Sequence, residues 1–103
     1  IIVRGKPALN DVIYEDAISV GIDEYGEIVE NGTDIPGTDL REINKKTSET
    51  IFESDLVISK GQGNFETLYG TDANIYYIFL CKCDMFAKRF AIPKYEGVFT
   101  KMK

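Results

Sequence analysis

The chain has 103 residues, the size of a single domain. Its 17 acidic residues outnumber its 12 Lys and Arg residues, and the resulting net charge of −5 argues against nucleic acid as a partner. Histidine is absent, which excludes Ser-His-Asp and Cys-His catalysis and histidine-ligated zinc.

The first predicted element is a strand over residues 1–4, IIVR. Because the chain opens in strand-like sequence without methionine, we expect it to be cut from a longer polypeptide. Residues 1–103 are then either a single α/β domain or the C-terminal portion of a larger one. A short helix is predicted over residues 11–20, where Asp11 can cap the first turn and Gly21 can end the helix.

A second strand is predicted over residues 27–30, and a longer helix over residues 38–53. Apolar residues recur along this helix at spacings of three or four, as the buried face of a helix requires. Thr38 is its predicted N-cap, and Asp39 suits the positive end of the helix dipole.

The second half of the chain continues the alternation of strands and helices. Strands are predicted over residues 55–59 and 75–81, helices over 64–69 and 84–91, and an edge strand in the tail 97–103, GVFTKMK.

This alternation predicts an α/β fold with a mostly parallel sheet. We expect the first four strands to lie in one sheet with helices on both faces. The result would be a three-layer, Rossmann-like arrangement that forms a fragment of a larger domain. No apolar run of membrane-spanning length and no basic-then-apolar leader occurs, so we expect a soluble cytoplasmic protein without a membrane partner.

Two cysteines, Cys81 and Cys83, flank Lys82 in an apolar run. At a period of two residues both would point to one face of a strand, so we expect two core thiols in a reducing compartment. A zinc or redox site is the less favoured interpretation, since the chain has no further cysteine and no histidine.

Three loops rich in Gly, Asn, Asp and Lys each leave a strand and enter a helix: residues 4–11, 30–38 and 59–64. In parallel sheets, ligands bind at the carboxyl ends of the strands, where such loops converge. In the third loop, SKGQGN, Lys60 could reach a phosphate while Gly61 permits close backbone approach. An ordinary turn with a solvated lysine fits equally well, because the full P-loop pattern is missing.

Asp11, which follows Asn10 at the end of the first loop, is a hard oxygen ligand of the kind that Mg²⁺ accepts. From this residue alone, a plain helix cap is the favoured interpretation. Asn31 and Gly32 form a standard turn pair, so a structural role is favoured for the second loop.

Four strings give the sequence a family resemblance: VRGKPALNDVIYEDA, ENG followed by PGT, DLVISKGQGNFETL, and IFLCKC. In this order they resemble the C-terminal part of the metal-dependent damage-control phosphatases, long known only as a domain of unknown function. The resemblance spans nearly all of residues 2–100. It implies an α/β/α sandwich, a divalent metal ion such as Mg or Mn as cofactor, and hydrolysis of small phosphate esters. Its partner would be a small phosphorylated metabolite, such as a sugar phosphate or a damaged metabolite.

The resemblance also implies roles for individual residues. Asp11 matches a metal-ligand aspartate, and Lys60 matches the catalytic lysine that holds the phosphate. Gly61 and Asn64 belong to the same phosphate-binding loop.

The family's Asp-Asn metal pair should lie upstream of the first strand, and nothing in this chain matches it. The isolated chain is therefore expected to lack activity and to expose apolar faces. Those faces would be covered in a homo-oligomer or by association with the missing N-terminal part. The alternative function is a non-catalytic module that binds a phosphorylated metabolite, or an inactive structural fragment.

Overall fold

The strands form two separate sheets in the computed structural model, which describes residues 1–101. The elements in chain order are β1 (Ile2–Val3), α1 (Tyr14–Ser19), the 3-10 helix η1 (Ile22–Glu24), β2 (Val29–Glu30), α2 (Lys45–Glu53), β3 (Val57–Lys60), α3 (Gln62–Leu68), β4 (Ile75–Leu80), α4 (Asp84–Phe90) and β5 (Gly97–Thr100). The predicted alternation of strands and helices, and hence the α/β class, is confirmed.

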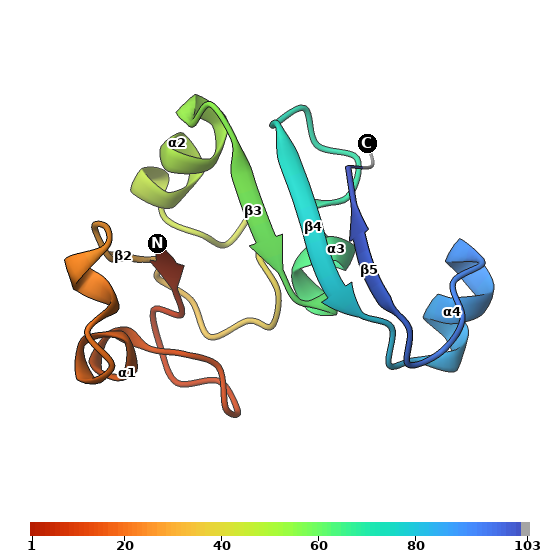
Figure 1. Ribbon diagram of the computed structural model, residues 1–103. Coiled ribbons are helices and arrows are strands. Elements are labelled where there is room, and N and C mark those ends of the chain that lie inside the picture. Colours follow the sequence, from red (N-terminus) through yellow and green to blue (C-terminus); the bar gives the residue numbers. More distant parts are fainter. Residues whose placement is uncertain (102–103) are drawn as a thin grey trace.

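The prediction of a single sheet is wrong for the described residues. Strands β1 and β2 form a parallel pair, whereas β3, β4 and β5 form a second sheet in which β3 and β4 are parallel and β5 is antiparallel (Figure 1). Within the part of the chain that the structure describes, β3 pairs with no strand except β4, so a gap separates it from β1.

Helix α1 begins later than predicted, because Asp11 does not cap it. The N-cap is Ile13, whose backbone N–H donates to Oδ2 of Asp16 at 3.1 Å. Asp11 instead forms an ion pair with Arg4, so its carboxylate belongs to the loop between β1 and α1.

Helix α2 begins at Lys45 and not at Thr38. Asn44 is its N-cap, with Oδ1 accepting from the backbone N–H of Thr47 at 2.9 Å. Thr38 makes its hydrogen bonds to α3 instead, which anchors the preceding loop and leaves only a single turn from Asp39 before the helix.

The second half follows the prediction closely. Helices α3 and α4 lie within two residues of their predicted bounds, and the tail forms the expected edge strand, β5. Residues 102–103 of the predicted tail lie outside the described residues.

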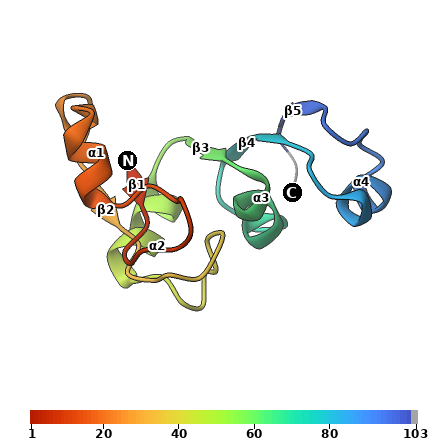
Figure 2. The same ribbon diagram turned by 90° about the horizontal axis from the view of Figure 1, so that it is seen from below.

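The core lies on one face of the β3–β4–β5 sheet and has a group of aromatic rings at its centre. Phe65 of α3 has no exposed surface, and its ring lies within 5.6 Å, centroid to centroid, of the rings of Tyr69, Tyr77, Phe79, Phe86 and Phe90. Figure 2 shows α2, α3 and α4 on this side of the strands. The opposite face of the same sheet carries exposed apolar side chains, including Ile58, Ile78 and Phe99.

Only one of the two cysteines is a core thiol. Cys81 is buried, but Cys83 is exposed because the strand has ended and Cys83 is the N-cap residue of α4. Among the described residues, no helix has the length and apolar character needed to cross a membrane.

Candidate functional site

A polar cleft of about 490 Å³ opens at the carboxyl ends of β1 and β3. Its lining includes all four residues assigned to the site from sequence: Asp11, Lys60, Gly61 and Asn64. Asn31 lines it as well, so the three loops meet at one cleft as predicted, although the strands that they follow lie in two sheets.

Arg4, directly after β1, builds one wall of the cleft. It is buried, and its guanidinium donates to the carbonyl oxygens of Ile35 and of Gly37, the latter at 2.8 Å. The same guanidinium lies 3.1 Å from Oδ2 of Asp11. One side chain therefore ties the first loop to the second and sets the position of the Asp11 carboxylate.

Asp11 is a ligand of the right type for a hard divalent ion, but the described residues do not complete a metal site. Its side chain is about half exposed, and one of its oxygens is paired with Arg4. Across residues 1–101, no group of three or more His, Cys, Asp and Glu side chains lies close enough to hold an ion. The chain as described thus offers one carboxylate of such a site.

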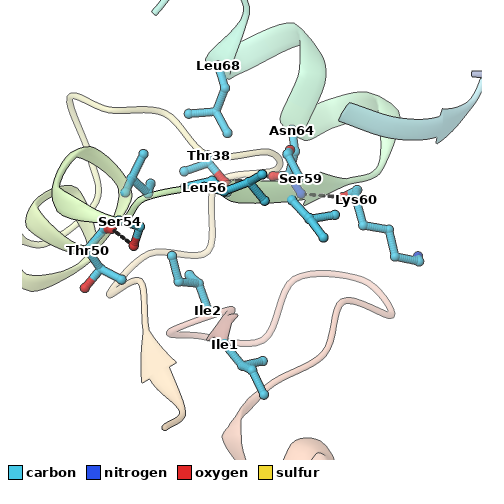
Figure 3. Close-up of a pocket in the computed structure, with 13 residues that line it drawn as sticks. Ile1, Ile2, Thr38, Thr50, Ser54, Leu56, Ser59, Lys60, Asn64 and Leu68 are labelled. Carbon is cyan, nitrogen blue, oxygen red and sulfur yellow. Dashed lines mark hydrogen bonds between the residues drawn. The ribbon is translucent and has the colours of Figure 1, made fainter. Parts of the chain in front are cut away.

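Lys60 occupies the last position of β3, and its side chain extends from the strand end (Figure 3). Asn64 fixes the backbone here, because its Nδ2 donates to the Lys60 carbonyl at 2.6 Å. Oδ1 of Asn64 accepts from the Thr38 hydroxyl at 2.7 Å. Asn64 therefore holds the base of Lys60, and its predicted contact with phosphate stays a prediction.

Gly61 follows with φ 107° and ψ 145°, a conformation that is essentially confined to glycine. An added Cβ would make an ordinary van der Waals contact with Nδ2 of Asn64 at 3.8 Å, so the backbone conformation, and not crowding, requires glycine here. The Gly61 N–H donates to the Ile78 carbonyl at 2.9 Å. This N–H is part of the sheet, which leaves the predicted role of Gly61 in binding phosphate untested.

The second loop packs tightly against the third, because two glycines meet. A Cβ on Gly37 would lie 2.6 Å from the Gly63 carbonyl oxygen. Asn31 joins the second loop to the first through Oδ1, which accepts from the N–H groups of Gly5 and Thr33. The favoured structural role of Asn31 is therefore confirmed by its contacts.

Lys82 is a cleft residue that the sequence reasoning missed. It follows β4 by two positions, and its backbone N–H donates to Oε1 of Gln62 at 2.8 Å. Its position just beyond the carboxyl end of a parallel strand was the signal that could have identified it.

The charge of the cleft is positive although the chain is acidic. Its lining residues include three cations, Arg4, Lys60 and Lys82, and one carboxylate, Asp11, which Arg4 neutralises. Two lysines are left to attract an anion, and side-chain hydrogen bonds from Asn64 and Gln62 hold the backbone at both. A cleft of this size and charge suits a small anionic ligand.

Comparison with known proteins gives a consistent picture. A family model described as the damage-control phosphatase ARMT1-like domain matches residues 1–98. A damage-control phosphatase of Pyrococcus horikoshii is 34% identical over 97 residues, which are 91% of this chain and 34% of that protein. An uncharacterized protein of Methanocaldococcus jannaschii is 36% identical over 104 residues, covering 97% of this chain and 34% of that protein.

A solved structure also matches. The crystal structure of a DUF89 family protein from P. horikoshii has a TM-score of 0.93 and 33% identity, and the match covers 100% of this chain and 36% of that one. The chain therefore spans about a third of the length of the relatives that it matches.

Proposed function

This chain belongs to the damage-control phosphatase ARMT1-like family, and we therefore propose that the protein to which it contributes is a phosphomonoester hydrolase that depends on a divalent metal ion. Its substrates would be small phosphate esters such as sugar phosphates or damaged phosphometabolites. The same proposal includes a larger three-layer α/β/α domain, of which these residues form one part.

The observation that carries this proposal is the cationic cleft. Lys60, at the end of β3, and Lys82, two residues beyond β4, line one cleft in a chain whose overall charge would otherwise repel an anion. Fixed cations aimed at phosphoryl oxygens stabilise the charge that develops in phosphoryl transfer. In the proposed site both lysines bind the phosphoryl group.

In this proposal the metal ion, Mg, Mn or similar, takes one ligand from this chain and further ligands from outside it. Asp11 would be one ligand, held in orientation by Arg4, since Mg²⁺ commonly takes one or two protein carboxylates. Because the described residues supply a single carboxylate, we propose that the isolated chain binds phosphorylated compounds without hydrolysing them.

Two substitutions in a full-length family protein carrying this sequence test the assignments. Lys60→Ala should lower phosphate release from a sugar phosphate by about two orders of magnitude, the usual effect of losing one preorganised electrostatic contact. Asp11→Asn should weaken binding of the metal ion and abolish turnover, because a neutral amide is a poorer ligand for a hard cation. Phosphate release and metal titration are the measurements.

Lys45→Ala is the matched control, since Lys45 is 90% exposed, lies on α2 and does not line the cleft. Its turnover should equal that of the unmodified protein. Normal turnover in Lys60→Ala would contradict the phosphate-binding role of Lys60. Unchanged metal affinity in Asp11→Asn would remove that residue from the metal site.

A further inference from the structure

Thr38 lines the cleft and is buried, and it makes two hydrogen bonds to residues of α3. Its hydroxyl donates to Oδ1 of Asn64 at 2.7 Å, and its backbone N–H donates to Oγ1 of Thr67 at 2.7 Å. The sequence predicted only a helix cap at this position, and the cap of α2 is Asn44. The contacts of Thr38 therefore need an explanation of their own.

The hydroxyl of Thr38 begins a chain of hydrogen bonds that ends at Lys60 (Figure 3). The side-chain amide of Asn64 has an oxygen that accepts and a nitrogen that donates. Because the oxygen accepts from Thr38, the nitrogen is left to donate to the Lys60 carbonyl at 2.6 Å. In the reverse orientation the amide oxygen would face that carbonyl, and no bond could form. The Thr38 hydroxyl thus selects the amide orientation that holds Lys60.

The residue before Thr38 contacts the other side of the cleft. The Gly37 carbonyl accepts from the guanidinium of Arg4 at 2.8 Å, and the same guanidinium lies 3.1 Å from Oδ2 of Asp11. Two adjacent residues of the second loop therefore reach the two sides of the site. Gly37 is connected to Asp11, and Thr38 is connected to Lys60.

This connection matters because the two sides of the cleft follow strands of different sheets. Strand β1 pairs with β2, whereas β3 pairs with β4, and within residues 1–101 no ladder joins the two sheets. Backbone pairing among these strands therefore does not set the spacing between the loop that carries Asp11 and the end of β3. The second loop, which bonds to both, can set it.

We infer that Thr38 is a positioning residue for Lys60. Its hydroxyl acts through the amide of Asn64 to hold the end of β3, so that the Lys60 ammonium keeps a fixed place relative to Asp11. A cation held in place stabilises a reacting phosphoryl group better than one that must be ordered during the reaction. This inference rests on the proposed function, in which Lys60 binds the phosphoryl group, and Thr38 itself makes no contact with the substrate.

Two substitutions of Thr38 in the full-length family protein carrying this sequence test the role of its hydroxyl. Thr38→Val keeps the branched shape but removes the hydroxyl, and should lower phosphate release from a sugar phosphate about tenfold, the effect of a misplaced catalytic group. Thr38→Ser keeps the hydroxyl and should retain turnover. Metal affinity should be unchanged in both variants, because Arg4 and not the Thr38 hydroxyl holds Asp11.

A double-mutant cycle with Lys60 separates positioning from a general loosening of the loop. If Thr38 acts through Lys60, Thr38→Val should cause no further loss of turnover in a protein that already carries Lys60→Ala. A loosened loop would instead lower turnover in both backgrounds, and would weaken metal binding through the contact of Gly37 with Arg4. Equal losses in the two backgrounds would overturn the inference, as would normal turnover in Thr38→Val.

A measurement that does not depend on activity keeps this inference separate from the proposed function. The side-chain amide signal of Asn64 in a heteronuclear NMR spectrum reports its bond to the Lys60 carbonyl. This signal should shift in Thr38→Val and stay in place in Thr38→Ser. An unchanged signal in Thr38→Val would overturn the inference even if turnover fell. If the unmodified protein released no phosphate, the proposed function would fail, and the Asn64 signal would still decide whether Thr38 orients this amide.

Discussion

Arg4 is the residue on which the wall of the cleft depends most. Arg4→Met keeps the length of the side chain but leaves the carbonyls of Ile35 and Gly37 without their donor. We expect the free energy of unfolding to fall by about 2–3 kcal/mol, the scale of losing buried hydrogen bonds to a charged group. Urea denaturation of the 103-residue chain gives the measurement.

Arg41→Met is the control for Arg4→Met, because the Arg41 side chain is 86% exposed and pairs, among residues 1–101, only with Asp39. Exposed ion pairs contribute about 0–1 kcal/mol, so this variant should unfold close to the unmodified chain. Equal losses in the two variants would show that Arg4 has no special structural role.

The same Arg41 determines how Asp39 titrates. Hydrogen bonds from the Arg41 side chain hold the pKa of the Asp39 carboxyl at about 2, below the ordinary value of 3.8. A lowered pKa in the folded state means that the pair contributes to stability above pH 3.8 and loses that contribution as the pH falls through 2. An NMR titration should give a midpoint near 2, and Arg41→Met should move it back toward 3.8.

Among the elements, helix α2 offers a direct test of where a helix begins. Asn44→Ala removes the side-chain acceptor for the Thr47 N–H and should cost about 1 kcal/mol, with loss of helical signal in far-UV circular dichroism. Thr38→Ala, at the cap predicted from sequence, should leave that signal unchanged because Thr38 lies six residues before the cap. A larger loss of helix in Thr38→Ala would contradict this assignment.

The error in the predicted start of α2 shows what local sequence patterns can and cannot predict. Apolar spacing identified the helix, since Thr47 and Ile51 are buried along it. Both Thr38 and Asn44 are good N-cap residues, so composition could not choose between them. The choice depends on Thr38 bonding to Asn64 and Thr67, which lie 26 and 29 residues further along the chain.

Long-range pairing limited the other predictions in the same way. The strand and helix pattern was readable because β-branched and aromatic runs are local signals, and the loops at the strand ends correctly indicated the cleft. The strands form two sheets because β1 and β3 do not pair. Which strands become neighbours depends on contacts between distant parts of the sequence, so no local pattern predicts it. The bond from the Gly61 N–H to Ile78 is likewise set by the register of β3 against β4.

For the molecule as a whole, Phe65 is the core residue whose loss should destabilise the fold most. Phe65→Ala removes a ring with no exposed surface that contacts five other aromatic rings, and should cost about 3–5 kcal/mol. A small domain has about 5–15 kcal/mol of total stability, so a large share of the chains should unfold at moderate temperature. Thermal unfolding followed by circular dichroism measures the loss.

Phe99→Ala is the matched control, since Phe99 is 67% exposed on the face of the β3–β4–β5 sheet that lies opposite the core. Its effect should stay within about 1 kcal/mol, as for most substitutions outside a core. A comparable loss of stability in both variants would mean that this exposed face is covered in solution, for example by self-association of the chain.

The uneven distribution of the core along the chain has a consequence for how the protein is made. Every member of the buried hydrophobic cluster except Ile51 lies between Phe65 and Phe86. A ribosome releases the N-terminal residues first, so the segment that carries Arg4 and Asp11 emerges before the surface on which it packs has been synthesised. The cleft can therefore form only after the residues of β3 and α3 that line it have been synthesised.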